Sequence, residues 1–169
     1  MADMLAVSIE GLDELIAKAH NSGALIGRPL KRFFTLSAIA VQKQSRELAP
    51  VDRGLLRSSI AYDVDGGTVP EWAKIGPNVP YGASVEFGIG DFNEGPGGLG
   101  QAPLPTAEQL EGWARRKGLD PVMVARAIER KGGIRPNPYM RGGFEAALLD
   151  IYEYLDACAT EIEEEWGRG

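Results

Sequence analysis

The strongest constraint on the fold of this chain is an apolar stripe near its C-terminal end. Apolar side chains recur there every three or four residues, at Phe144, Leu148, Ile151, Leu155, Cys158, Ile162 and Trp166. This spacing places all of them on one face of a helix. The other face is acidic and carries Asp150, Glu153, Asp156, Glu161 and Glu164. A long helix with one apolar face has to bury that face against another element.

A second long helix is predicted from Pro29 to about Leu48. Pro29 suits a first turn, where its missing N–H leaves no helical hydrogen bond unmade. Pro50 ends the helix, because the residue before a proline avoids helical geometry. The predicted buried stripe consists of Leu30, Phe34, Ser37, Val41, Ser45 and Leu48, widened by Phe33, Leu36 and Ala40.

Short strands and turns are predicted around these helices. Residues 4–9 form an apolar run typical of a strand, and 12–20 have the spacing of a short helix. Ile60, Tyr62 and Val64 alternate with polar or small residues, which predicts a strand with one buried face. Gly66-Gly67 favours a hairpin turn into a partner strand over 68–75, where Pro70 indicates an edge or a bulge.

The region after this hairpin is rich in turn-forming residues. Gly76-Pro77-Asn78 predicts a turn, and residues 81–87 fit either a strand or a short helix. Glycine and proline make 88–105 an expected exposed loop. Two short helices should follow, one opened by a capping box of Thr106 with Gln109 and ended by Gly118, the other over 122–131 and ended by Gly132-Gly133.

These elements predict an α+β fold. A small, mostly antiparallel sheet should pack against the long central helix and the long C-terminal helix. We expect a single domain over 1–169, with a glycine- and proline-rich loop and short helices as an insert over 90–133.

Charge and cysteine content narrow the function. The 18 basic and 24 acidic residues give a formal charge of −6, which disfavours general binding to nucleic acid phosphates. Cys158 is the only cysteine, so no intramolecular disulfide can form. The sequence shows neither a secretory signal nor an apolar run long enough for a membrane span, so we expect a soluble protein or a part of a soluble assembly.

The search for catalytic, cofactor and metal residues predicts none. His20 is the single histidine and is expected to be solvated or to cap a helix. Cys158 lies on an apolar stripe with acidic neighbours, which favours a buried, unreactive thiol. Residues 95–100 spell G-x-G-x-x-G but lack the strand before and the helix after that a dinucleotide site needs.

Two charged clusters leave alternatives open. Asp63 and Asp65, with Glu71 and Glu86, could supply paired carboxylates for acid–base chemistry, but solvated strand positions are the simpler interpretation. The basic cluster of Arg28, Lys31 and Arg32 is interpreted as a solvated helix start, with a contact to DNA or an acidic partner as the second possibility. A small enzyme or regulatory binding domain would need a pocket at such carboxylates.

Three segments in order resemble the tail-component family of long-tailed bacteriophages. They are Ala49-Pro50-Val51-Asp52-Arg53-Gly54-Leu55-Leu56-Arg57-Ser58-Ser59-Ile60, Asn78-Val79-Pro80-Tyr81-Gly82-Ala83-Ser84-Val85-Glu86-Phe87-Gly88, and Pro136-Asn137-Pro138-Tyr139-Met140-Arg141 before the terminal helix. Arg53, Gly82 and the Pro138-Tyr139-Met140 step depart from the family's usual Thr, Ala and Pro-Phe-Leu. The resemblance covers the chain apart from the insert.

Within these segments, the residues expected to maintain the fold or to contact neighbouring subunits are Pro50, Asp52, Gly54, Leu55, Arg57, Tyr81, Glu86, Phe87, Gly88, Pro138, Tyr139 and Met140. Gly54 and Gly88 permit abrupt changes of chain direction. Tyr81 and Phe87 are large enough to anchor their segment to the sheet.

The resemblance implies a structural virion protein and not an enzyme. Such a protein would form a ring, with six copies favoured, at the neck between head and tail, and genomic DNA would pass through its lumen without sequence-specific binding. Its partners would be a head-completion (stopper) protein and the tail terminator or tail tube protein. It would be found in the virion, after assembly in the host cytoplasm. The alternative within this class is the tail terminator itself, which caps the tube.

Overall fold

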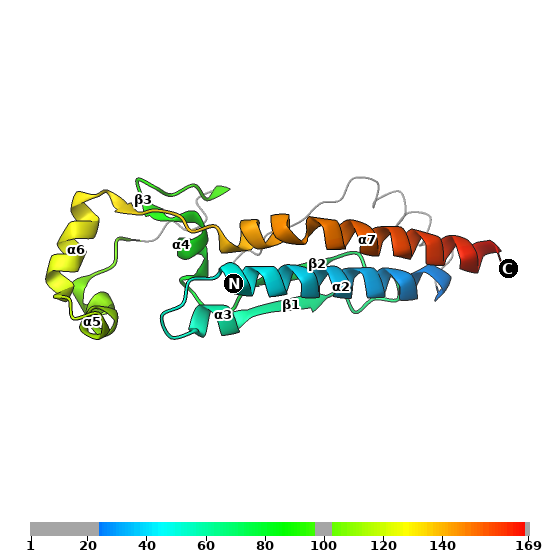
Figure 1. Cartoon of the computed structure of the whole chain (residues 1–169), viewed down its shortest axis with the longest axis horizontal. Helices are drawn as coiled ribbons and strands as arrows, with labels where there is room; N and C mark the ends of the chain where they lie inside the picture. The colour runs from blue at the N-terminus through cyan, green and yellow to red at the C-terminus, as the bar shows by residue number, and fades with distance from the viewer. Residues whose placement is uncertain (1–23, 97–102, 168–169) are drawn as a thin grey trace. The chain divides into compact units, whose positions relative to one another are not determined.

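The computed structural model describes residues 24–96 and 103–167 and confirms the α+β class (Figure 1). The elements are α2 (Ala24–Leu48), α3 (Leu55–Ser59), β1 (Ile60–Val64), β2 (Ala73–Pro77), α4 (Gly82–Phe87), β3 (Ile89–Gly90), α5 (Ala107–Arg116), α6 (Pro121–Arg130), β4 (Gly133–Ile134) and α7 (Tyr139–Gly167). The strand and helix predicted over 4–20, with His20, lie outside the described residues. The described chain divides into two compact units, Val79–Pro138 and the remainder.

The larger unit is built on α2 and α7, which lie side by side and run in opposite directions (Figure 1). Their facing sides are apolar because both sequences repeat apolar residues at helical spacing. The buried side chains include Leu30, Phe33, Phe34, Ala38 and Val41 of α2, and Ala147, Ile151, Cys158 and Ile162 of α7. Full burial of one large apolar side chain stabilises the fold by roughly 1.5–3 kcal/mol, so this interface dominates the stability of the unit.

A close backbone approach fixes where the two helices meet. A Cβ atom on Gly143 would lie 2.5 Å from the Ser45 nitrogen and 2.6 Å from its Cα, so only glycine fits. Gly143 and Ser45 are both buried. The absence of a side chain at Gly143 therefore sets the relative register of α2 and α7.

The first sheet pairs β1 with β2 in antiparallel register, Ile60 opposite Pro77 and Tyr62 opposite Ile75. This sheet packs on α2. The Gln42 and Arg46 side chains of α2 donate hydrogen bonds of 2.9 and 2.7 Å to the Ile60 carbonyl oxygen at the start of β1. Two polar side chains thereby satisfy a backbone acceptor at the helix–sheet boundary.

Several predicted boundaries differ from the observed ones. The central helix begins at Ala24, before Pro29, which lies buried inside it. One backbone hydrogen bond is lost at this proline, and burial of Ile26 and Pro29 offsets that loss. Leu48, predicted to be buried, is 49% exposed because it is the last residue of α2, although its side chain approaches α7 at Gly142.

The strand predictions are also partly wrong. β2 begins only at Ala73, and it includes Gly76 and Pro77, which were assigned to a turn. Pro77 is tolerated at the end of the ladder because no further strand hydrogen bond is required there. Tyr62 is exposed, so the alternation in β1 does not mark a fully buried face. The ambiguous segment 81–87 forms the helix α4.

The unit Val79–Pro138 contains α4, the insert helices and a second small sheet. β3 lies in the predicted loop and pairs antiparallel with β4, Ile89 opposite Ile134. The predicted capping box opens α5, with Thr106 accepting from the Gln109 N–H and Gln109 accepting from the Thr106 N–H. Asp120 caps α6 by accepting from the Val122 and Met123 N–H groups.

Candidate functional site

The first motif segment forms the corner between α2 and β1. Gly54 has φ +77° and precedes α3, which confirms the predicted sharp turn. Leu56 is the buried side chain of this corner, whereas Leu55 is exposed, as are Pro50 and Asp52. The Arg57 guanidinium donates to the Glu47 carbonyl oxygen at 3.5 Å, a long contact that holds the corner weakly. The corner therefore buries one leucine and presents its neighbour to solvent.

The second motif segment forms α4 and the bend after it. Gly88 has φ +75°, and a Cβ there would lie 2.8 Å from the Ile134 carbonyl oxygen and 2.9 Å from the Pro136 nitrogen. The predicted abrupt exit at Gly88 is confirmed, because only glycine permits this backbone approach. Glu86 is buried and Phe87 is half-buried. Tyr81 is 45% exposed, so its ring is not the buried anchor that the sequence predicted.

The third motif segment leads into α7. Pro138 is exposed, and the next two residues, Tyr139 and Met140, are 1% and 4% exposed. Two large buried side chains therefore close the first turn of the helix. The three segments thus lie at chain corners and helix entries.

The thiol and the carboxylates that were considered as chemical groups lie in buried, loop-shaping or exposed positions. Burial, followed by the charge of Glu161, raises the pKa of the Cys158 thiol from 9.0 to about 11, so the thiol stays protonated near neutral pH. Asp65 accepts hydrogen bonds from the Gly67 and Glu71 N–H groups, both at 3.1 Å, and thereby shapes the β1–β2 loop. Asp63 is exposed in β1. Within 24–96 and 103–167, no group of three acidic, cysteine or histidine side chains could hold a metal ion.

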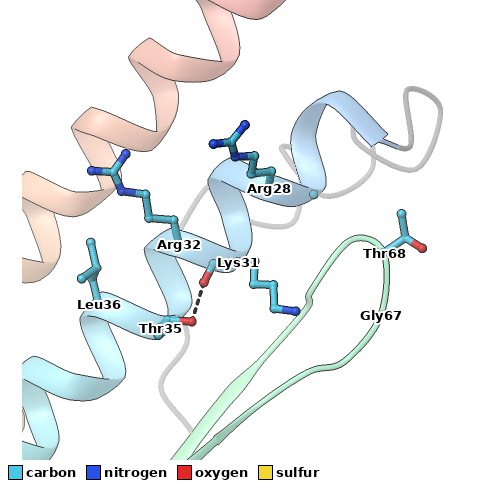
Figure 2. A pocket seen from close by; sticks show the side chains of 8 residues that line it. Arg28, Lys31, Arg32, Thr35, Leu36, Gly67 and Thr68 are labelled. Atoms are coloured by element: carbon cyan, nitrogen blue, oxygen red, sulfur yellow. Dashed lines mark hydrogen bonds between the residues drawn. The ribbon is translucent and has the colours of Figure 1, made fainter.

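A shallow hollow of about 450 Å³ lies beside the first turns of α2. It is lined by Gly27, Arg28, Lys31, Arg32, Thr35, Leu36, Gly67 and Thr68. Figure 2 shows Arg28 and Arg32 extending from the same side of α2, while Lys31 points toward the loop that carries Gly67 and Thr68. The structure therefore gathers the three predicted basic residues at one surface depression.

The basic residues of this hollow make little use of internal ion pairs, so their charge is available to an external partner. Arg32 lies 3.7 Å from Glu161 of α7, but its side chain is 70% exposed. An exposed pair of this kind stabilises a fold by roughly 0–1 kcal/mol. Arg28 and Lys31 have no carboxylate within salt-bridge distance among the residues described. An acidic group can therefore bind here without breaking a strong internal pair.

The outer face of α7 carries an apolar pair that the sequence analysis missed. Leu149 and Tyr152 are 78% and 61% exposed and lie three positions apart, hence on the same side of the helix. The acidic residues Glu145, Glu153 and Asp156 lie near them on the helix, Glu163 lies eleven positions beyond Tyr152, and all four are exposed. The acidic residues of the outer face of α7 favoured its interpretation as a solvated face. The i, i+3 spacing of Leu149 and Tyr152 was the signal in the sequence for an exposed apolar pair on this helix.

The insert helices also expose apolar side chains. Trp113 of α5, Leu119 after it, and Val122 and Met123 of α6 are each more than a third exposed, and Ala114 is the only residue of the two helices that is buried. The two helices contact each other but leave much of their apolar surface in solvent. Exposed apolar groups of this kind are typical of surfaces that bind other proteins.

The comparisons with known proteins give no match. No protein-family model, curated protein or solved structure matches the chain. Among the described helices, none is long and apolar enough to cross a membrane.

Proposed function

We propose that this chain is a structural virion subunit of the head–tail junction of a tailed bacteriophage. In this role it forms a ring, with six copies favoured, that joins or completes the tail and lets genomic DNA pass through its lumen. The proposal combines the resemblance of the three ordered segments with the exposed surfaces described above. It assigns the protein no catalytic residue and no cofactor.

The exposed pair Leu149 and Tyr152 on α7 is the structural observation that best supports this role. A long helix that buries one face and presents a large aliphatic and an aromatic side chain on the other suits a protein packed on two sides. Aromatic side chains are enriched at protein–protein interfaces. A catalytic role would instead favour a pocket with converging polar groups and perturbed titratable residues.

The proposed neighbours are a head-completion protein on one side and the tail terminator or tube protein on the other. DNA in the lumen would be contacted without sequence readout. A net charge of −6 suits such a channel, because a strongly basic wall would hold the phosphates instead of letting the duplex slide. The protein would assemble in the host cytoplasm and remain in the virion.

Light scattering across a concentration series tests this proposal, with the purified protein alone and with neighbouring virion components. We expect particles of one defined mass, alone or on the template ring, and that mass gives the number of copies. Binding only to the last ring of the tail tube would assign the chain as the terminator. A strict monomer that joins no virion component would contradict the proposal.

A further inference from the structure

We propose that α7 of one copy packs antiparallel against α2 of the next copy, through faces that are exposed in the single chain. The inference deepens the proposed ring and rests on it for its biological setting. It identifies a second copy of this chain as the partner of both exposed faces.

The exposed face of α7 has the spacing of a helix-packing seam. Its residues are Glu145, Leu149, Tyr152, Asp156 and Glu163, with steps of four, three, four and seven positions. Such steps keep side chains on one line along a helix. Two of these residues are largely exposed apolar groups, and the other three are exposed acids. A partner should therefore be apolar at one position and basic at the end near Glu163.

The exposed face of α2 has this complementary character. Arg28, Arg32, Thr35 and Ile39 follow one another at steps of four, three and four positions. Arg28 and Arg32 are exposed and line the basic hollow, and Ile39 is 42% exposed despite its apolar side chain. The face thus has a basic end at Arg28 and Arg32 and an apolar end at Ile39.

An antiparallel alignment pairs the two faces along their length. Arg28 lies eleven positions before Ile39, and Glu163 lies eleven positions after Tyr152. When Ile39 is placed against Tyr152, Arg28 therefore stands opposite Glu163, and Thr35 stands opposite Asp156. The apolar groups Ile39, Tyr152 and Leu149 are then covered together, and opposite charges meet at one end.

The proposed pairing of α2 and α7 between copies has nearly the same axial offset as the α2–α7 pairing within one copy. Within one copy, Ser45 meets Gly143, and Arg32 lies near Glu161. The proposed contact places Arg32 opposite Ala159, which is two positions or about 3 Å along the helix from Glu161. Successive copies are therefore shifted little along the helix axes. A head-to-tail contact without such a shift forms a ring when the rotation between copies closes, whereas a shifted one produces a filament.

The basic hollow has a direct role in this contact. It is lined by Arg28 and Arg32 of the proposed face, and it extends to Lys31 and the Thr68 loop beside that face. Glu163 of the neighbouring copy would approach Arg28 at the rim of this hollow. Because rim charges mainly control orientation and association rate, the apolar groups should contribute most of the affinity.

Two variants of the full-length protein test the contact by light scattering, with and without template components. Ile39→Glu disables the α2 face and Tyr152→Glu disables the α7 face, and both sites are exposed, so folding should be preserved. Each variant should lower the association constant at least tenfold. Glu108→Lys on α5, an exposed charge change outside both proposed faces, is the control and should assemble like the unmodified protein.

Mixing the two variants identifies the head-to-tail geometry. Each retains one intact face, so the intact α7 face of Ile39→Glu can bind the intact α2 face of Tyr152→Glu. The mixture should therefore form dimers and nothing larger, because the two altered faces repel each other. Normal rings from either single variant would contradict the proposed contact but not the proposed ring. If the unmodified protein forms no oligomer under any of these conditions, the proposed function fails as well.

A charge exchange tests the alignment itself. Arg28→Glu and Glu163→Arg should each weaken association about two- to fivefold, as expected for an exposed ion pair, and the double variant should restore it. Circular dichroism verifies that all three remain folded. If Arg28→Glu abolishes binding to duplex DNA and leaves assembly unchanged, the α2 face contacts phosphates and the inference is wrong.

Discussion

The two compact units use amphipathic helices in different ways. α2 and α7 bury their apolar faces against each other, and the buried side chains include two phenylalanines and several aliphatic residues. In α5 and α6 only Ala114 is buried, although both helices have well-defined ends. Clear helical signals in a sequence therefore do not tell whether the helix contributes to a core.

The difference lies in which interactions hold each helix. Local interactions define α5 and α6: the Thr106–Gln109 capping box, the Asp120 cap, and Gly118 and Gly132, both at positive φ. Long-range burial holds α2 and α7, whose contacts join distant parts of the sequence. Most of the stability should therefore reside in the α2–α7 unit, while the insert keeps its shape through caps and turns.

The largest expected effect comes from removing a core ring. Phe33→Ala, at a side chain only 2% exposed, should lower the free energy of unfolding by about 3–5 kcal/mol. Met123→Ala in the insert should change it by less than about 0.5 kcal/mol, because this side chain is exposed. Urea denaturation followed by circular dichroism measures both. Equal effects of the two substitutions would remove the contrast between the units.

Thiol reactivity should give the next largest contrast. The pKa of Cys158 is raised from 9.0 to about 11 in the folded protein. At pH 8 the folded thiol should therefore react about a hundredfold more slowly than the unfolded one, since a thiolate is the reacting species. Met123→Cys in a Cys158→Ala background should react at the rate of an exposed thiol. A thiol reagent monitored by absorbance, with and without urea, gives these rates.

The same pKa shift predicts a loss of stability at high pH. The unfolded chain releases the Cys158 proton near pH 9, whereas the folded chain holds it to about pH 11. The contribution is therefore fully present below pH 9 and is lost as the pH rises from about 9 to 11. The Cys158→Ala variant should lack this component of the pH dependence. An identical decline in both proteins would contradict the assignment.

Two glycine substitutions, one in each unit, test the contrast between the units through the smallest expected changes in stability. Gly143→Ala should destabilise the fold by about 1–3 kcal/mol, because the added Cβ meets the Ser45 backbone. Gly112→Ala in α5 should stabilise its helix by about 0.5–1 kcal/mol, because the nearest atom, on the flexible Arg116 side chain, is 3.5 Å away. Thermal unfolding and far-ultraviolet circular dichroism report the two signs. Stabilisation by Gly143→Ala would show that the helices separate easily.

Local signals in the sequence allowed most of the fold to be predicted. The periodicity of α7, the capping box at Thr106 and the turn at Gly54 depend on neighbouring residues, and the structure confirms them. The start of α2 was predicted wrongly because burial of Ile26 and Pro29, a tertiary effect, outweighs the local preference of proline. The same limit applies to β2, whose pairing partners in β1 decide that Gly76 and Pro77 belong to the strand.

The candidate surfaces were less predictable than the fold. The basic residues at Arg28, Lys31 and Arg32 were visible in the sequence, but the hollow forms only because the loop at Thr68 approaches α2 at Gly27. Leu149 and Tyr152 lie outside the apolar stripe of α7, so the sequence contained the signal for their exposure, but the acidic residues of that face favoured a fully solvated surface. Tyr81 was expected to be an anchor because of its size, yet its position leaves it in solvent.

The distance in sequence between α2 and α7 has a consequence for synthesis of the chain. A ribosome releases α2 first, then both small sheets and the insert, and only afterwards α7, the helix that packs along α2. Until then, the apolar side of α2 remains open to chaperones and to other nascent chains. α2 can pack against β1 and β2 earlier, but its packing is completed only when α7 has emerged, so a prematurely terminated chain would lack the surface that completes the core.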